Sequence, residues 1–260
     1  MQPVRRVQEQ WGTVISVDVR DPVDESVVDA CFAWFTRVDD LFSTWRYDTE
    51  IMRIARGELA ATEYSPEMAT VLRLCEDMRL ESGGAFDISF GARACAVPAP
   101  GRAALDPSGL VKGWAVARAG DLLRDAGASN FFVNAGGDVL TAGRAEGTSG
   151  WRVGIQHPWE RDRFAAVLQV SDAAVATSGR YERGDHVVDP STGRPATGLA
   201  SVTVVGPDLA LADAFATAAV VLGPDDGMRW LATRVGYEGM GITDDRVVVV
   251  TPSFDRYRVS

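Results

Sequence analysis

Apolar residues recur along this chain with two spacings, one typical of strands and one typical of helices. The order of these segments constrains the fold more than any other feature. Residues 14–19 alternate apolar and polar side chains, which is typical of a strand. Residues 28–42 repeat apolar side chains at helical spacing. Ser65-Pro66 supplies a capping serine and a first-turn proline for a second helix, and Gly83-Gly84 ends it. Strand and helix therefore both occur within the first third of the chain.

The rest of the chain continues this mixture. Further helices are predicted at 111–126 and 211–222, further strands at 131–134, 151–155, 165–170, 174–177, 201–205 and 247–251, and a loop at 94–103. The elements do not follow a strict strand–helix–strand alternation, so the order favours an α+β or layered α/β fold with antiparallel pairs. We find no repeat and no clear linker, and we expect a single domain over residues 1–260.

Composition excludes several classes of protein. With 260 residues and 46% hydrophobic side chains the chain can build a sizeable core. It has no apolar run of 18 residues and no apolar segment after Arg5-Arg6, so we expect neither a membrane span nor a signal peptide. A net charge of −10 argues against general nucleic-acid binding. Cys31 and Cys75 fall in apolar helical patterns, which fits buried thiols and a cytoplasmic location.

Five segments are richer in Gly, Asp, Ser and Thr than a plain core requires. Each alone is more often a turn than a site. They are residues 42–46, 83–87, 106–113, 134–138 and the stretch from Ser178 to Gly193.

The segment 106–113 has the clearest chemistry of its own. Gly109 and Lys112 stand where a loop becomes a helix, and free N–H groups at a helix start attract phosphate. The spacing of a P-loop is not present. The segment therefore indicates a phosphate contact of another kind.

Asp213 and Thr217 lie four residues apart on the predicted helix 211–222, which places them on one face. Their oxygens suit a hard cation such as Mg²⁺, which takes few protein ligands. The alternative is a helix-start aspartate that the helix dipole favours and a threonine in the core. Spacing alone favours this second interpretation.

Two other side chains have open interpretations. His186, between Asp185 and Asp189-Pro190, is a candidate proton acceptor or phosphate partner, although a lone histidine is more often structural. Trp45, after a helix, has a flat ring that can stack on a flavin or adenine or can belong to the core.

Taken in order, these segments resemble the ApbE family, the FAD:protein FMN transferases, from about Trp11 to Gly223. The matching blocks are Trp11-Gly12-Thr13, Phe42-Ser43-Thr44-Trp45, Gly84-Ala85-Phe86-Asp87, Asp106-x-x-Gly109-x-x-Lys112-Gly113, Val133-Asn134-x-Gly136-Gly137-Asp138, Ala176-Thr177-Ser178-Gly179-x-Tyr181, His186-Val187-Val188-Asp189-Pro190-x-Thr192-Gly193-x-Pro195 and Ala212-Asp213-Ala214-x-Ala216-Thr217. Three positions depart from the family pattern: Trp11 replaces methionine, Trp45 replaces tyrosine or phenylalanine, and Gly109 stands where alanine is common.

The resemblance implies a T-fold-like α+β architecture with mixed or antiparallel sheets and packed helices, binding one FAD. By position, the flavin nucleotide would contact Trp11, Trp45, Ala85, Phe86, Asp87, Asp106, Lys112, His186 and Val187. Mg²⁺ would be held by the backbone oxygen of Gly109 and the side chains of Asp213 and Thr217. This ligand set agrees with the spacing argument for the last two residues and favours the metal interpretation.

The implied reaction moves FMN from FAD to a serine or threonine hydroxyl of an acceptor protein, with release of AMP. Either His186 or Asp189 would accept the proton of that hydroxyl. Two other functions use the same residues: hydrolysis of FAD to FMN and AMP, and storage of FAD without cleavage. The sequence does not separate these three.

Overall fold

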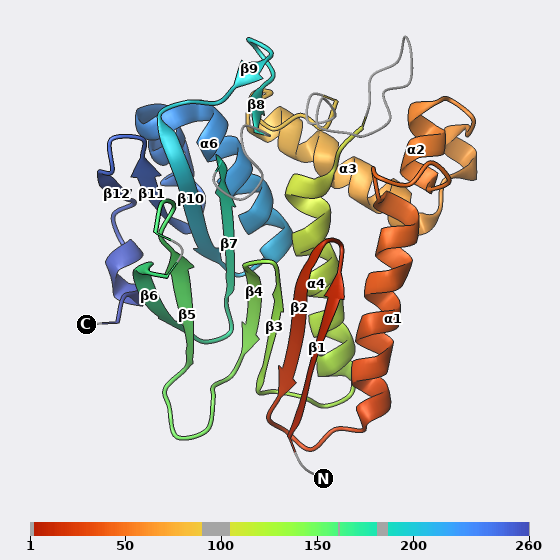
Figure 1. Cartoon of the computed structure of the whole chain (residues 1–260), viewed down its shortest axis with the longest axis vertical. Helices are drawn as coiled ribbons and strands as arrows, with labels where there is room; N and C mark the ends of the chain where they lie inside the picture. Colours follow the sequence, from red (N-terminus) through yellow and green to blue (C-terminus); the bar gives the residue numbers. More distant parts are fainter. Residues whose placement is uncertain (1–2, 90–104, 161, 181–186, 260) are drawn as a thin grey trace.

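An eight-stranded antiparallel sheet organises the molecule (Figure 1). The computed structural model describes residues 3–89, 105–160, 162–180 and 187–259. The strands lie in the spatial order β1 (Val4–Gln10), β2 (Thr13–Val19), β3 (Phe131–Ala135), β4 (Asp138–Ala142), β7 (Ala174–Gly179), β10 (Leu199–Gly206), β11 (Glu238–Thr243) and β12 (Val248–Val250). The sheet thus joins strands from both ends of the chain.

Helices pack against one face of this sheet, and a hairpin packs against the other. The helices are α1 (Glu25–Phe42), α2 (Glu50–Ala55), α3 (Pro66–Glu81), α4 (Ser108–Asp125) and α6 (Leu209–Leu231), with short 3₁₀ turns η1 (Ala61–Glu63) and η3 (Phe254–Tyr257). The hairpin is β5 (Trp151–Gln156) with β6 (Phe164–Val170), and a smaller one joins β8 (Val188–Asp189) to β9 (Arg194–Pro195). In Figure 1, α4 and α6 run side by side along the sheet.

The central strands serve two hydrophobic cores at once. In β4, Leu140 belongs to the core beneath the helices, whereas its neighbour Val139 belongs to the core beneath the β5–β6 hairpin. In β7, Ala174 and Val175 divide in the same way. Successive side chains of a strand point to opposite faces, so a strand covered on both faces buries all of its side chains, including polar ones such as Asp138 and Thr141. This explains why all of β4 and β10 is buried.

The structure confirms the α+β class and the main helices predicted from the sequence. Ser65 caps α3, because its Oγ accepts the backbone N–H of Met68 at 3.2 Å. Helix α4 begins at Ser108 rather than Val111, since the carboxylate of Asp106 accepts the Ser108 N–H at 3.0 Å.

Several elements differ from the sequence expectation. Strands β1, β4 and β11 and helix α2 were not predicted, and α6 continues past Leu222 through a kink at Gly223, whose φ is 84°. The predicted loop 94–103 lies outside the described residues. Within the described part of the chain, no helix is long and apolar enough to cross a membrane.

The partly buried carboxylate of Asp21 fixes the start of β3. Asp21 accepts the backbone N–H groups of Ser129 and Asn130, both at 2.6 Å, and the amide of Asn130 at 3.0 Å. Partial burial acts to raise the pKa of Asp21, but these hydrogen bonds outweigh it and hold the pKa below 3.8.

We therefore expect Asp21→Asn to lower the free energy of unfolding at pH 7 by about 1 kcal/mol. A depressed carboxylate pKa stabilises the fold above the unfolded-state pKa, and this stabilisation is lost as the pH falls through the folded-state pKa. Denaturant unfolding between neutral pH and pH 3 measures the difference, which should shrink at the acid end. Asp162→Asn, at an exposed position, is the control. A difference that stays constant with pH would contradict this role of the carboxylate.

Candidate active site

Three charged side chains from three elements meet at the start of the central strand β4, on the helix side of the sheet. The Lys112 ammonium, on α4, lies 2.7 Å from a carboxylate oxygen of Asp138 at the start of β4. Asp213, on α6, has its carboxyl within hydrogen-bonding reach of that same Asp138. Asp138 is fully buried and Asp213 is 2% exposed, whereas the Lys112 side chain is 21% exposed. The cluster therefore holds two buried carboxyl groups and one ammonium, with an opening to solvent at the lysine.

The electrostatics of this cluster favour an additional positive charge. Burial raises the pKa of Asp213 well above 3.8, and the negative charge of Asp138 raises it further. The charge of Lys112 and the Gly113 N–H, which donates to Asp213 at 3.2 Å, offset only part of this rise. A cation beside Asp213 would stabilise its ionised form.

The other two predicted metal-binding residues lie next to Asp213. Thr217 is one turn further along α6, and its Oγ lies 2.9 Å from the Oγ of Ser178. A Cβ placed on Gly109 would come within 2.9 Å of the Thr217 hydroxyl, so the Gly109 backbone lies directly against it. The structure thus gathers a carboxylate, two hydroxyls and a backbone segment around one point.

This set of donors fits a hard divalent cation. All of the groups are oxygen donors, which Mg²⁺ prefers, and Mg²⁺ keeps several of its waters rather than requiring a full protein cage. No three His, Cys, Asp or Glu side chains among the described residues come close enough to hold a metal by themselves. The site therefore suits a metal that a nucleotide phosphate helps to hold.

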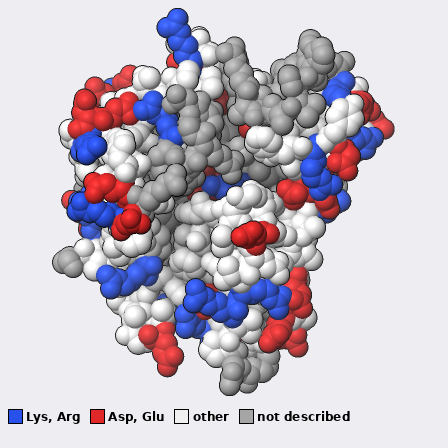
Figure 2. Space-filling view, viewed as in Figure 1, with Lys and Arg blue, Asp and Glu red and all other residues white. Residues whose placement is uncertain are grey.

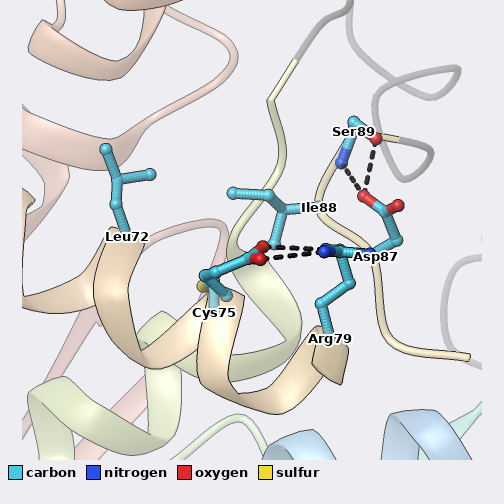
Figure 3. Close-up of a pocket in the computed structure, with 7 residues that line it drawn as sticks. Leu72, Cys75, Arg79, Asp87, Ile88 and Ser89 are labelled. Atoms are coloured by element: carbon cyan, nitrogen blue, oxygen red, sulfur yellow. Dashed lines mark hydrogen bonds and ion pairs between the residues drawn. The ribbon is translucent and has the colours of Figure 1, made fainter. Parts of the chain in front are cut away.

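One predicted residue, Asp87, lines a cavity of about 340 Å³ beside α3 (Figure 3). Asp87 stands at its edge and accepts the backbone N–H and hydroxyl of Ser89, at 2.8 and 2.6 Å. Arg79 and Glu76 of α3 also line the cavity and form a two-pronged ion pair, at 2.7 and 2.8 Å. The lining of the cavity thus carries one guanidinium and two carboxylates.

Three more of the expected residues connect this cavity to the charged cluster. The Asp106 N–H donates to the Ile88 carbonyl at 2.8 Å, which joins the start of α4 to the cavity wall. Ala85 and Phe86 are buried, and the Phe86 ring would lie 3.3 Å from a Cβ on Gly109. The segment from Ala85 to Asp87 therefore runs from the predicted metal position to the cavity.

The two tryptophans differ in environment. Trp11 lies with Gly12 in the two-residue turn between β1 and β2, both with positive φ. Its indole N–H donates to the Phe35 carbonyl at 3.0 Å, and its ring packs edge-to-face on Phe35 at 5.3 Å. Trp45, after the end of α1, is 65% exposed. The ring of Trp45 is available for stacking, whereas that of Trp11 is already packed on α1.

Asp189 and Val187 belong to the small β8–β9 hairpin. Val187 is buried and accepts the Ala196 N–H at 2.9 Å. The Asp189 carboxylate accepts from the hydroxyls of Ser191 and Thr192, at 2.8 and 2.9 Å. Partial burial works to raise the pKa of Asp189, but its hydrogen bonds lower it overall. A carboxylate so held is a poor proton acceptor and is well suited to closing a turn. His186 lies outside the described residues.

Asp138 and Ser178 stand inside the site, and sequence reasoning gave them no role. Both occur in segments rich in Gly, Asp or Ser, but neither has the helical spacing that drew attention to Asp213. Asp138 meets Lys112 and Asp213 only because β4 packs beneath both α4 and α6 in the fold. The glycines that precede it, Gly136 and Gly137, both have positive φ and were the available signal for a functional turn.

Figure 2 shows the face of the molecule seen in Figure 1, hollowed near its centre between groups of charged side chains at the rim. Lys or Arg atoms are visible inside that hollow. This face thus offers a recess with positive charge in a chain whose net charge is −10.

Comparison with known proteins places these features in context. The model of the ApbE family matches residues 11–97 and 93–240. A FAD:protein FMN transferase of Rhodobacter capsulatus is 38% identical over 157 residues, which are 57% of this chain and 30% of that protein. Another of Vibrio cholerae is 28% identical over 240 residues, covering 74% of this chain and 72% of the relative.

Solved structures confirm the architecture. The flavin transferase ApbE from Vibrio cholerae superposes with a TM-score of 0.82 at 24% identity, over 98% of this chain and 99% of the other. The ApbE protein from Thermotoga maritima superposes with a TM-score of 0.87 at 23% identity, over the whole of both chains. The fold is therefore the α+β architecture of ApbE proteins that the sequence predicts.

The close approach of α4 and α6 generates a prediction. A Cβ on Gly113 would lie 2.4 Å from the Leu209 carbonyl oxygen, so α6 must shift to accept it. We expect Gly113→Ala to lower the free energy of unfolding by about 1–3 kcal/mol. Because Asp213 lies on the displaced helix, Mg²⁺ affinity should fall as well. Thermal unfolding and calorimetric titration measure both effects. Arg118→Ala, on the exposed side of α4, should leave both nearly unchanged. Wild-type stability in Gly113→Ala would show that the helices are not in contact there.

Proposed function

This chain belongs to the ApbE family, and we propose that it acts as a FAD:protein FMN transferase, moving FMN from FAD to a serine or threonine hydroxyl of an acceptor protein. The observation that carries this proposal is the buried Asp213 beside Asp138, next to Thr217 and Gly109. The sheet that runs from β1 to β12 supports treating residues 1–260 as one domain. The cysteine pattern supports a cytoplasmic location.

In this proposal, Mg²⁺ is held by Asp213, Thr217 and the backbone oxygen of Gly109. When bound, the ion would place positive charge beside the FAD pyrophosphate and would stabilise the negative charge that develops there during the transfer. Asp138 positions Lys112 through their 2.7 Å ion pair, so that the ammonium has a defined place beside the phosphates. The net negative charge of the two carboxyl groups and one ammonium supports a cation at this point.

The flavin nucleotide would lie from the charged cluster towards the cavity beside α3. Asp106, Ala85, Phe86 and Asp87 line that path. The exposed ring of Trp45 would be available to stack on a flavin or adenine ring. Because the side chains of Trp11 and Val187 are packed, both residues would contact the flavin nucleotide through the backbone, or in the case of Trp11 through the edge of its ring.

The transfer itself is a displacement at phosphorus. The acceptor hydroxyl oxygen forms a bond to the phosphorus of the FMN half, the bond from that phosphorus to the bridging oxygen breaks, and AMP leaves. The hydroxyl proton passes to a base. His186 is the better candidate for that base, because Asp189 has a lowered pKa and binds Ser191 and Thr192.

Incubation of the full chain with FAD and Mg²⁺, with and without a threonine-bearing acceptor peptide, tests the proposal. Mass spectrometry should find the mass of FMN on the peptide and AMP in solution. Free FMN and AMP with an unmodified peptide would show a hydrolase instead. Intact FAD retained by the protein would show a storage protein.

Asp213→Asn separates the metal function from the fold. We expect this variant to lose Mg²⁺-dependent turnover, because the amide removes the ionised ligand. In EDTA its unfolding temperature should equal or exceed that of the wild type, because one of two facing buried carboxyl groups becomes neutral. Asp225→Asn, at an exposed position on α6, is the matched control and should match the wild type in both assays. Full turnover in Asp213→Asn would overturn the metal assignment.

A further inference from the structure

A groove of about 270 Å³ lies on the opposite face of the sheet from the helices, between the β5–β6 hairpin and strands β11 and β12. Its apolar lining is unusually exposed: Phe164 is 66% exposed, Val248 is 47% and Trp159 is 40%. Ile242 forms its floor and is buried. Exposed aromatic side chains gathered at one groove are typical of a surface that a partner covers.

The charged side chains that line this groove are both arginines, Arg163 and Arg246. Glu160 pairs with Arg163 at 2.8 Å. The Arg246 guanidinium lies over the Trp159 ring, 5.2 Å from its centroid. Arg246 has a φ of 66°, a conformation that favours glycine or asparagine, yet the chain places an arginine there. The groove thus offers a cationic group on an aromatic face, in a chain whose net charge is −10.

The groove lies on the opposite face of the sheet from the proposed active site, and a series of contacts around the ends of the strands links the two. Ser178, whose hydroxyl contacts Thr217, is two residues before Arg180. The Arg180 guanidinium binds the Ala196 carbonyl at 3.0 Å and pairs with Asp244. Asp244 begins the turn that carries Arg246. Arg246 is therefore linked to Ser178 in the proposed active site through Asp244 and Arg180.

The edge of the sheet suggests the form of the occupant. β12 is the last strand of the sheet, and Val248 and Val250 on it are exposed. Extended peptides add to such open edges through backbone hydrogen bonds and place alternate side chains into neighbouring pockets. The groove is large enough for one or two side chains, not for a folded domain.

We propose that this groove docks an extended segment of the acceptor protein that carries carboxylates next to an apolar side chain. The apolar side chain would pack between Trp159 and Val248, and a carboxylate would pair with Arg246. The net charge of −10 disfavours an anionic membrane or a nucleic acid, which carry far more negative charge than a short segment. The identity of the partner as the acceptor rests on the proposed transferase function.

The test uses two synthetic peptides that share a phenylalanine and a threonine and differ only in carrying three glutamates or three lysines. Fluorescence anisotropy with the FAD-loaded full chain should show binding of the acidic peptide alone. Arg246→Asn keeps a residue that accepts this backbone conformation, and it should weaken binding about three- to fivefold, the effect of one exposed charge pair. Trp159→Ala should weaken it about tenfold or more through loss of the apolar contact. Arg256→Asn, which removes an exposed arginine stacked on Tyr257, is the control.

Equal binding of both peptides, equal loss in Arg246→Asn and Arg256→Asn, or preferential binding to vesicles of anionic lipid would each overturn the proposal. FMN transfer is followed in the same samples. Binding of the acidic peptide that depends on Arg246, without FMN transfer to any acceptor, would uphold the docking site and refute the transferase function. Transfer that proceeds equally to both peptides and in all variants would do the reverse.

Discussion

The burial of the Asp213 carboxyl against Asp138 is the interaction on which the rest of this site depends. Two carboxyl groups in one desolvated space repel each other when ionised, and Lys112 with one backbone N–H compensates them only in part. Such an arrangement raises the free energy of the metal-free fold. A bound cation would supply the missing charge, which is why we propose this cluster as part of a metal site.

The same cluster requires that two helices and a strand come unusually close. Gly113 allows α4 to approach the Leu209 carbonyl on α6, and Gly109 allows the first turn of α4 to lie against Thr217. Strand β4, which packs beneath both helices, then brings Asp138 to Lys112 and Asp213. The small residues at the contact between the helices and the strand that is buried on both faces therefore act together. Their packing sets the positions of the charged groups.

Much of this could be predicted from the sequence because it depends on local periodicity. Helices α1 and α3 follow from apolar spacing and from the Ser65 cap. Strands β4 and β11 were not predicted, because β4 is short, buried on both faces and contains Asp138 and Thr141, and β11 carries Gly239 and Gly241, so neither alternates in the expected way. The pairing of Asp213 with Thr217 needed only a helix, whereas the involvement of Asp138 needed the tertiary fold.

The sequence by itself determined the α+β class, the family and the helical face that carries Asp213 and Thr217, because each depends on residues that are near one another in the chain or on ordered motifs. Only the tertiary structure decided that Lys112, Asp138 and Asp213 share one buried cluster, that Trp11 is packed while Trp45 is exposed, and that Arg246 lies over Trp159. Those facts depend on contacts between residues dozens of positions apart, and burial, which sets both pKa and ring accessibility, is a property of the whole fold.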